Sequence, residues 1–174
     1  MTLLSTALQI AVKAHDGQKD KAGVDYIWHP ITVAGFCNGE KGKLAAILHD
    51  TVEDSDVTLD GLREAGIGED IVTAVDCLSK RKDESLDAYY GRVAANDIAI
   101  EVKFADMRHN GDRARWPKES RDKAEDNYIK YAGRTVSLYE AVGERAKTLM
   151  SEGTLDLLLK MLEERGGSFG RREG

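Results

Sequence analysis

The segment 44–50 constrains the fold more than any other part of the chain. Its letters are LAAILHD, so five apolar residues run without a polar side chain until His49 and Asp50. This pattern predicts a fully buried helix from Leu44 to about Val52. Ionisable side chains at the end of a buried helix are costly unless they are paired or bind a metal ion. The segment therefore predicts a helical core with a polar site inside it.

The remainder of the chain is also predicted to be helical. Apolar residues recur at helical spacing in most segments, and only two prolines occur among 174 residues. The run 98–104 comes closest to the alternation of a strand, but the helical patterns around it favour a helix. Thr58 is a predicted N-cap, and Gly39 and Gly42 are predicted to lie in a turn. The predicted helices cover residues 3–15, 31–37, 44–52, 59–65, 69–79, 86–95, 98–110, 117–142 and 155–164. We expect an all-α bundle of about eight to ten helices.

Length, composition and charge narrow the class of protein. The length suits one domain over 1–174, in which we expect 165–174 to be a frayed tail. The formal net charge of −6 disfavours nucleic acid or a membrane surface as a partner, although a small phosphorylated substrate remains compatible with it. Two isolated cysteines, no signal peptide and no membrane-spanning run lead us to expect a cytoplasmic location. The sequence leaves the oligomeric state open.

Acidic residues follow His49 and Asp50 one helical turn later, at Glu53 and Asp54. On a continuous helix these four positions fall within an arc of about 140°. Three carboxylates on one face repel one another and raise each other's pKa values. A divalent cation would relieve this repulsion, and mixed imidazole and carboxylate ligands suit Mn²⁺, Fe²⁺ or Zn²⁺.

Two further residues are candidate ligands elsewhere in the chain. His29 directly precedes Pro30 at the start of a predicted helix, and Asp106 interrupts an apolar helical face on which an acid requires a partner. Together with His49 and Asp50 they form a plausible set of two histidines and two carboxylates. We expect His109, one turn after Asp106, to support this site rather than to bind the metal.

Three segments resemble a known family. They are AHDGQKDKAGVDYIWHPITVAG at 14–35, AAILHDTVEDSDVT at 45–58 and VKFADMRHN at 102–110. Their order and spacing resemble the HD-domain metallophosphohydrolases, and most closely the hydrolase domain of RelA/SpoT-type enzymes and the small alarmone hydrolases. The resemblance extends from about residue 5 to about residue 140.

This resemblance implies an all-helical HD-domain bundle that binds one Mn²⁺ ion. It implies removal of the 3′-pyrophosphate from the stringent-response nucleotides ppGpp and pppGpp, which yields GDP or GTP and pyrophosphate. By the same resemblance, the metal ligands are His29, His49, Asp50 and Asp106. The acidic pair that positions and activates water is Glu53 and Asp54. Substrate contacts fall at Lys19 near the base, Asn110 near the ribose and Tyr128 near the phosphates.

One departure from the family pattern keeps other functions open. Many relatives place an arginine two residues after the asparagine that matches Asn110, whereas this chain has Asp112 there and Arg113 one position later. A second hypothesis is therefore an HD-type nucleotidase or nucleotide phosphohydrolase that acts on a nucleoside monophosphate or NADPH. A third is a non-catalytic module that senses nucleotides.

Overall fold

The computed structural model describes residues 1–169, with side chains to residue 163, and this part of the chain is all-helical. The prediction of an all-α bundle is confirmed. The α-helices in this range number eleven, and α4 is a single turn of four residues. In chain order the elements are α1 (Leu3–Ala14), α2 (Trp28–Gly35), α3 (Glu40–Leu48), α4 (Thr51–Asp54), α5 (Leu59–Glu64), α6 (Glu69–Leu78), α7 (Leu86–Ala94), α8 (Asp97–Asn110), the 3-10 turns η1 (Arg113–Arg115) and η2 (Lys118–Ser120), α9 (Arg121–Val142), α10 (Arg145–Leu149) and α11 (Glu152–Phe169).

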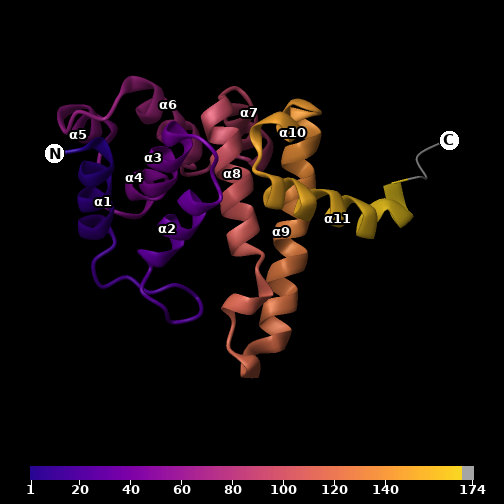
Figure 1. Cartoon of the computed structure of the whole chain (residues 1–174). Helices are drawn as coiled ribbons and strands as arrows, with labels where there is room; N and C mark the ends of the chain where they lie inside the picture. The colour runs from indigo at the N-terminus through magenta and orange to yellow at the C-terminus, as the bar shows by residue number, and fades with distance from the viewer. Residues whose placement is uncertain (170–174) are drawn as a thin grey trace.

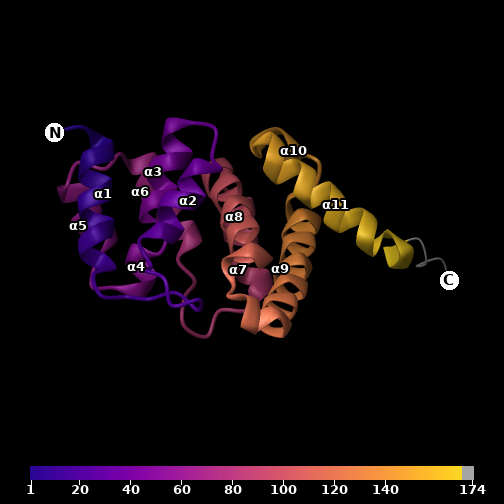
Figure 2. The ribbon, with the colours of Figure 1, turned by 60° about the horizontal axis from the view of Figure 1, so that its bottom comes forward.

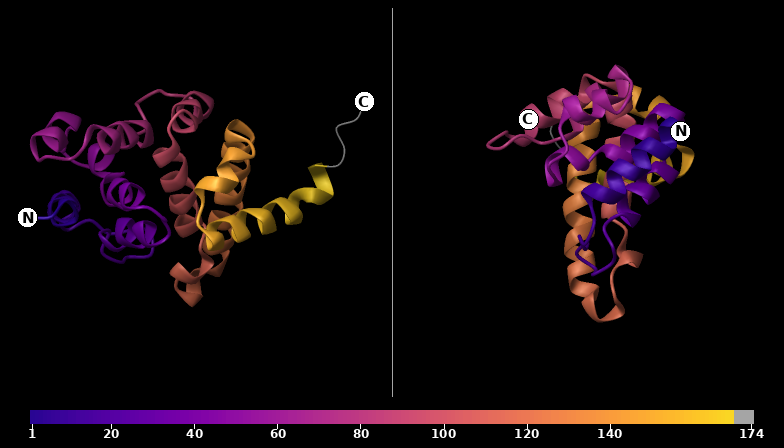
Figure 3. Two further views of the ribbon diagram at one scale, coloured as in Figure 1. Left: turned by 45° about the horizontal axis from the view of Figure 1, so that its top comes forward. Right: turned by 90° about the vertical axis from the view of Figure 1, so that its left-hand side faces the viewer.

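Helix α8 is the central element of the bundle (Figure 1). It packs against α2, α3, α6 and α7 on one side and against α9, α10 and α11 on the other. Figure 2 shows the long helix α9 beside α8, with α1 to α6 gathered on the opposite side. The C-terminal part of α11 points away from the bundle (Figure 3). Residues carried by α8 therefore lie where the two halves of the molecule meet.

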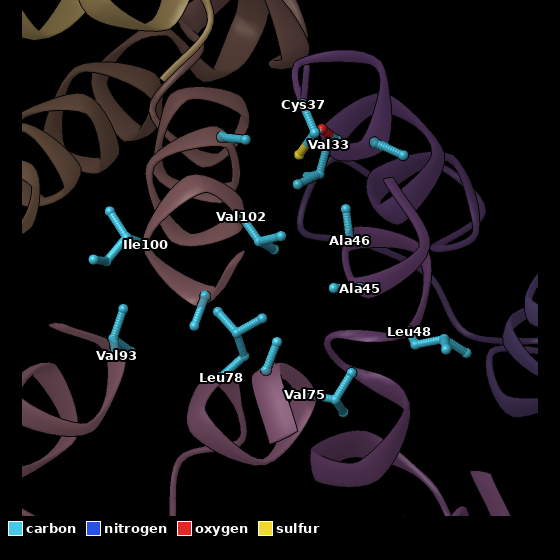
Figure 4. Packing of buried hydrophobic residues seen from close by; sticks show 14 of the residues in the cluster. Val33, Cys37, Ala45, Ala46, Leu48, Val75, Leu78, Val93, Ile100 and Val102 are labelled. Atoms are coloured by element: carbon cyan, nitrogen blue, oxygen red, sulfur yellow. The ribbon is translucent and has the colours of Figure 1, made fainter. Parts of the chain in front are cut away.

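Small apolar side chains fill the space between α3 and α8. Figure 4 shows Ala45 and Ala46 of α3 facing Val102 of α8, with Val33 of α2 beside them. All four side chains are fully buried. Short side chains let helix axes approach closely, and this brings α2, α3 and α8 within reach of one another.

Several predicted boundaries are confirmed and others are corrected. Thr58 caps α5 by accepting a hydrogen bond from the N–H of Gly61 at 3.0 Å. Helix α10 was not predicted, α9 begins later than expected, and α11 extends beyond residue 164. Residues 165–169 continue α11, whereas the rest of the expected frayed tail lies outside the described residues. No helix in the described range is long and apolar enough to cross a membrane.

The prediction that Gly42 lies in a turn is wrong, because Gly42 is buried inside α3. A Cβ atom there would lie 2.8 Å from Cδ of Glu101 on α8 and 3.3 Å from Cβ of Cys37. The Glu101 carboxylate accepts a hydrogen bond from the N–H of Asn38 at 2.5 Å. Glycine at this position therefore leaves space for the Glu101 carboxylate of α8 and for Cys37, and does not form a turn.

We expect Gly42→Ala to destabilise the protein although alanine favours helices. A gain of about 1 kcal/mol in helix propensity opposes a loss of about 2–3 kcal/mol from overpacking and a disturbed charged hydrogen bond. The matched control is Gly91→Ala in α7, where a Cβ meets nothing within 4 Å and should stabilise by about 0.5–1 kcal/mol. Urea unfolding of both variants measures the difference, and equal stabilisation would contradict the packing argument.

Candidate metal centre

Two imidazoles and two carboxylates meet in the core. His29 lies in the first turn of α2, and His49 and Asp50 form the junction between α3 and α4. Asp106 lies on α8. The two histidines and Asp106 are at most 3% exposed, and the side chain of Asp50 is 20% exposed. The structure therefore brings together all four residues that the sequence proposed as ligands.

Their facing atoms have the separations expected of ligands that share one ion. His29 Nε2 lies 3.4 Å from Oδ2 of Asp50 and 3.2 Å from Oδ1 of Asp106. His49 Nε2 lies 3.0 Å and 3.8 Å from the same two oxygens. Neighbouring ligands at about 2.1 Å from an ion are roughly 3.0–3.4 Å apart. One ligand atom from each of His29, His49 and Asp50 lies within 4.8 Å of the other two, and Asp106 faces both imidazoles from α8.

The orientation of His49 supports a cation at this point. Its Nδ1–H donates to the carbonyl of Ala46 at 2.7 Å, which leaves a lone pair on Nε2. That Nε2 is buried and has no hydrogen-bond partner within the described residues. A lone pair facing the carboxylate of Asp50 is repelled unless a proton or a metal ion lies between them. The residues present therefore fit a divalent ion.

Side-chain hydrogen bonds explain why the chain bends at the ligands. His49 donates to the carbonyl of Ala46, and Thr51 Oγ1 donates to the carbonyl of Leu48 at 2.8 Å. Such bonds compete with the backbone bonds that would continue the helix. The predicted continuous helix from Leu44 to Val52 is therefore interrupted after Leu48, and α4 starts at Thr51.

His109 forms a hydrogen bond with His29, one of the candidate ligands. The two Nδ1 atoms are 2.7 Å apart, so one donates to the other. Burial lowers the pKa of His109 to about 3, with further contributions from Arg115 and His29, so this ring is neutral. If His29 Nε2 binds the ion, its Nδ1–H is the donor and His109 Nδ1 is the acceptor. This tautomer orients the ligand imidazole.

Asp50 and Asp106 favour the protonated form of both ligand imidazoles. Burial alone would lower the pKa of His49, but Asp50 and Asp106 outweigh it and raise that pKa to about 10. Burial likewise opposes the raised pKa of His29, which the same two carboxylates produce. Despite burial, which raises it, the pKa of Asp50 is held well below its usual value by the two histidines. A divalent cation would replace the protons that these imidazoles otherwise attract.

Asp106 is fixed by two neighbours on its own helix. Lys103 Nζ lies 2.8 Å from Oδ2, and Asn110 Nδ2 donates to Oδ1 at 2.5 Å. The spacings of three and four residues place all three side chains on one face of α8. Burial would raise the pKa of Asp106, but Lys103 and the histidines hold it well below the usual value. The carboxylate therefore stays charged in a buried position.

A cavity of about 420 Å³ opens onto the ligands His29, Asp50 and Asp106. This volume is within the range of small-molecule sites. The wall carries both cationic and aromatic side chains, which suit a phosphorylated compound with a ring system. The cationic ones are Lys19, Lys21, Lys80, Lys103, Arg115 and Arg134, and the aromatic ones are Tyr26, Tyr89, Tyr90, Trp116 and Tyr131.

The predicted acidic pair is divided by the bend in the chain. Glu53 lines the cavity, and its Oε2 accepts a hydrogen bond from the N–H of Lys80 at 2.8 Å. Asp54 lines a neighbouring groove instead. Burial raises the pKa of Asp54, and the charges of Asp50 and Glu53 raise it further. Glu53 therefore faces the space beside the candidate ligands, whereas Asp54 lies in the groove next to it.

Two of the three predicted substrate-binding residues, Lys19 and Asn110, line the cavity. Lys19 lines the cavity and forms an exposed ion pair with Asp25 at 2.5 Å. Asn110 also lines the cavity, where its amide orients Asp106. Arg115 Nη1 donates to Oδ1 of Asn110 at 3.2 Å, and this fixes the amide. Both predicted positions are therefore at the site.

The expectation that Tyr128 contacts the substrate phosphates is not supported by its position. Its ring packs with Met161 of α11 and lies under the guanidinium of Arg113, 3.4 Å from that Cζ atom. The cavity is instead lined by Asn127 and Tyr131 of the same helix. Arg113 also pairs with Glu125 at 2.7 Å, so the displaced arginine points away from the cavity.

Three cavity residues were not recognised from the sequence. Tyr26 donates a hydrogen bond to Oδ2 of Asp50 at 2.6 Å, and Lys103 pairs with Asp106. Both lie three residues before a ligand, so one-turn spacing could have identified them. Arg115 also lines the cavity, and its guanidinium forms an ion pair with Asp20 at 2.7 Å. No sequence signal indicated that pair, because it joins loops 95 residues apart.

The side chain of Arg92 attaches the loop after α6 to the bundle. It donates to the carbonyls of Asp76 and Ser79 at 2.6 and 2.9 Å, and to both carboxylate oxygens of Glu84 at 2.7 Å. The same loop supplies the Lys80 N–H that orients Glu53. Arg92 therefore supports one wall of the cavity from behind.

This ion pair predicts a pH-dependent stability. Hydrogen bonds from Arg92 lower the pKa of Glu84 to about 2. A lowered carboxyl pKa stabilises the fold above the unfolded value of about 4.5, and the effect is lost as pH falls toward 2. We expect Glu84→Gln to lower the urea midpoint at pH 7, with the difference from wild type shrinking below pH 4.5. Glu140→Gln, at an exposed position on α9, is the control, and a constant difference at all pH values would contradict the prediction.

Comparisons with known proteins support the same class. A GTP pyrophosphokinase of Streptomyces coelicolor is 31% identical over 156 residues, which are 82% of this chain and 18% of that protein. A guanosine-3′,5′-bis(diphosphate) 3′-pyrophosphohydrolase of Vibrio cholerae is 35% identical over 116 residues, which are 58% of this chain and 16% of that protein. The chain thus spans less than a fifth of these two curated relatives. No protein-family model matches it.

A solved structure has the same fold over almost its whole length. It is a metazoan orthologue of SpoT that is described as hydrolysing ppGpp and as acting in starvation responses. The TM-score is 0.67 at 23% identity, and the match covers 95% of this chain and 97% of that one. The helical bundle and its two-His, two-Asp cluster define an HD-type domain. Within that class, the chain belongs to the RelA/SpoT family.

The ligand set predicts a metal-dependent stability. Mn²⁺ at one hundred times its Kd should stabilise wild type by about 2.7 kcal/mol, which raises Tm by roughly 5–10 °C. We expect His49→Ala and Asp106→Asn to lose this shift and to lose stoichiometric metal. Glu53→Gln is the control from the same cavity and should keep both. Full Mn²⁺ binding by Asp106→Asn would remove Asp106 from the ligand set.

Proposed function

We propose that the protein is an Mn²⁺-dependent phosphohydrolase that removes the 3′-pyrophosphate from ppGpp or pppGpp. The products would be GDP or GTP and pyrophosphate. The observation that carries this proposal is the convergence of His29, His49, Asp50 and Asp106 at the wall of a cavity rich in cations. The name of the Vibrio cholerae relative and the activity described for the metazoan SpoT structure support the choice of substrate.

The donor atoms favour hydrolysis over phosphate transfer from a nucleoside triphosphate. Phosphotransfer sites commonly use Mg²⁺, which prefers carboxylate, phosphate and water oxygens. Two imidazole nitrogens with two carboxylates suit Mn²⁺, and also Fe²⁺ or Zn²⁺. These metals make hydroxide available from water near neutral pH, because a bound divalent ion lowers the pKa of its water to about 7 in the best cases. The activity in the name of the Streptomyces relative is therefore not proposed for this chain.

Side chains around the candidate metal site would transfer the proton and stabilise the developing charge. The Glu53 carboxylate, held by the N–H of Lys80, would accept a proton from the attacking water and orient it. Asp54 would add negative charge that favours this transfer. Lys103 and Arg115 line the same cavity and would stabilise the charge that develops on the phosphoryl oxygens.

The remaining cavity residues would bind the nucleoside. Asn110 would stay near the ribose and Lys19 near the base, at the two lining positions where the structure has them. Trp116 and Tyr131 are half-buried aromatic side chains of the same wall and could stack on a base. The cytoplasmic location stays a prediction from the sequence.

Product analysis tests the substrate. Mn²⁺-loaded protein is incubated with ppGpp, GTP, GMP, dAMP or NADPH, and chelator-treated protein serves as the control. We expect metal-dependent release of GDP and pyrophosphate from ppGpp alone. Turnover of another nucleotide with ppGpp untouched would support the second hypothesis, a nucleotidase. No metal-dependent turnover of any of them would favour a sensing module.

The proposed role of Glu53 predicts a separation of binding from turnover. Glu53→Gln keeps the shape of the side chain but removes the proton acceptor, so we expect kcat to fall by about 10²- to 10⁴-fold. Metal content and KM should change little. A variant that retains wild-type kcat would show that Glu53 is not the proton acceptor.

A further inference from the structure

Gln18 joins three segments that surround the candidate metal centre. It lies in the loop after α1, and it is half-buried. Its amide Nε2 donates hydrogen bonds to the carbonyl of Ala14 at 3.3 Å, at the end of α1, and to the carbonyl of Asp54 at 3.0 Å, at the end of α4. Its own backbone carbonyl accepts a hydrogen bond from the N–H of Tyr26 at 3.0 Å. One residue therefore connects the ends of two helices to the segment that leads into α2.

The Gln18 amide has one orientation that satisfies all of its contacts. Both backbone carbonyls can only accept, so the side-chain nitrogen faces them and Oε1 faces His15. The Nδ1 atom of His15 lies 2.9 Å from that oxygen and is therefore the donor. His15 is 3% exposed, and its ring centre lies 4.9 Å from that of Tyr26. The side chain of Gln18 thus fixes the imidazole that packs against the Tyr26 ring.

The backbone makes a second connection between Gln18 and Tyr26. The loop between α1 and α2 contains a short antiparallel pair. The hydrogen bond from the N–H of Tyr26 to Gln18 closes one end of this pair, and the N–H of Asp20 donates to the carbonyl of Val24 at 2.8 Å at the other end. Such bonds hold two segments in a fixed register. A displacement of Gln18 therefore moves Tyr26 with it.

Tyr26 in turn contacts a candidate ligand. Its hydroxyl donates to Oδ2 of Asp50 at 2.6 Å. The same oxygen faces the Nε2 atoms of His29 and His49 at 3.4 and 3.0 Å. The phenol is rigid, so the position of its ring sets the position of its hydroxyl. Hydrogen bonds to a metal-binding carboxylate orient that carboxylate, and their loss typically weakens metal binding by about 10- to 100-fold.

We propose that Gln18 is a positioning residue of the metal centre, which acts by holding Tyr26 against Asp50. Gln18 does not line the cavity that opens onto the candidate ligands, and it lines the neighbouring groove instead. Its effect on the ligands therefore passes through Tyr26 and not through a contact with the substrate. This role rests on the metal-binding part of the proposed function and is independent of the identity of the substrate.

A double-mutant cycle tests this link. The Kd of Mn²⁺ is measured by calorimetry on metal-free protein for wild type, Gln18→Met, Tyr26→Phe and the double variant. We expect Tyr26→Phe to weaken Mn²⁺ binding by about tenfold, and Gln18→Met, which keeps the length of the side chain but removes its hydrogen bonds, to weaken it by about fivefold. Because Gln18 acts through Tyr26, the double variant should bind Mn²⁺ no more weakly than Tyr26→Phe does. Losses that multiply to about 50-fold would overturn the proposal, because the two residues would then act independently.

Gln9→Met is the matched control, because Gln9 is an exposed glutamine of α1, and it should leave the Kd of Mn²⁺ unchanged. Urea unfolding of the metal-free proteins separates positioning from folding. A lower urea midpoint for Gln18→Met with a wild-type Kd would assign Gln18 a structural role only and would contradict the proposal. Gln18→Glu keeps the shape of the side chain but replaces the donating amide, and it takes the place of Gln18→Met if that variant does not fold. Undetectable Mn²⁺ binding by wild type at millimolar concentration would also exclude the positioning role.

Turnover of ppGpp separates this role from the proposed function. Weaker Mn²⁺ binding in Gln18→Met, together with no turnover of ppGpp by wild type, would keep the positioning role and discard the proposed substrate. Turnover of ppGpp by wild type with an unchanged Kd of Mn²⁺ in Gln18→Met would keep the substrate and discard the positioning role.

Discussion

The burial of two ionised carboxylates, Asp50 and Asp106, is the constraint on which the site depends. Buried carboxylates are expelled or protonated unless positive charge or hydrogen-bond donors surround them. Here the donors are the two histidines, the Tyr26 hydroxyl, the Lys103 ammonium and the Asn110 amide. A divalent ion would complete this arrangement, because it would satisfy at one point the Nε2 of His49 and the oxygens that face it.

The fold meets this constraint by using α8 as a shared support. One face of α8 presents Lys103, Asp106 and Asn110 in consecutive turns, and the remaining faces are covered by apolar neighbours. Small alanines let α3 pack closely against α8, and Gly42 leaves space there for the Glu101 carboxylate. This packing brings His49 and Asp50 to the same point. The positions of His49 and Asp50, directly after α3, therefore depend on packing contacts that lie more than one turn earlier in that helix.

Local patterns predicted most of the helices and indicated four candidate ligands that the structure brings together. The apolar run before His49, the N-cap at Thr58 and the isolated acid at Asp106 each report on their immediate surroundings. Features that depend on distant contacts were not predicted correctly. Gly42 leaves space for the side chain of Glu101, which is 59 positions further along the chain. No local sequence pattern reveals such a contact.

The same distinction explains why Asp54 and Tyr128 do not line the cavity. Asp54 leaves the cavity because side-chain bonds from His49 and Thr51 end α3 early, so an ideal helical arc no longer applies. Tyr128 faces α11 because the rotation of α9 about its axis is fixed by packing on both sides. Family resemblance supplied the residue but not the side of the helix on which it lies.

The division between helices and loops also bears on substrate choice. All four ligands lie on or directly between helices of the core, whereas one wall of the cavity is closed by Asp20 and Arg115 from two loops. Loops tolerate substitution and insertion better than a packed core does. Replacing Arg115, or the loop that carries Asp20, would therefore alter which nucleotide fits while leaving the four candidate ligands in place. The proposed phosphate hydrolysis thus depends on the four candidate ligands in the core, whereas the fit of a particular nucleotide depends on the segments that close the cavity wall.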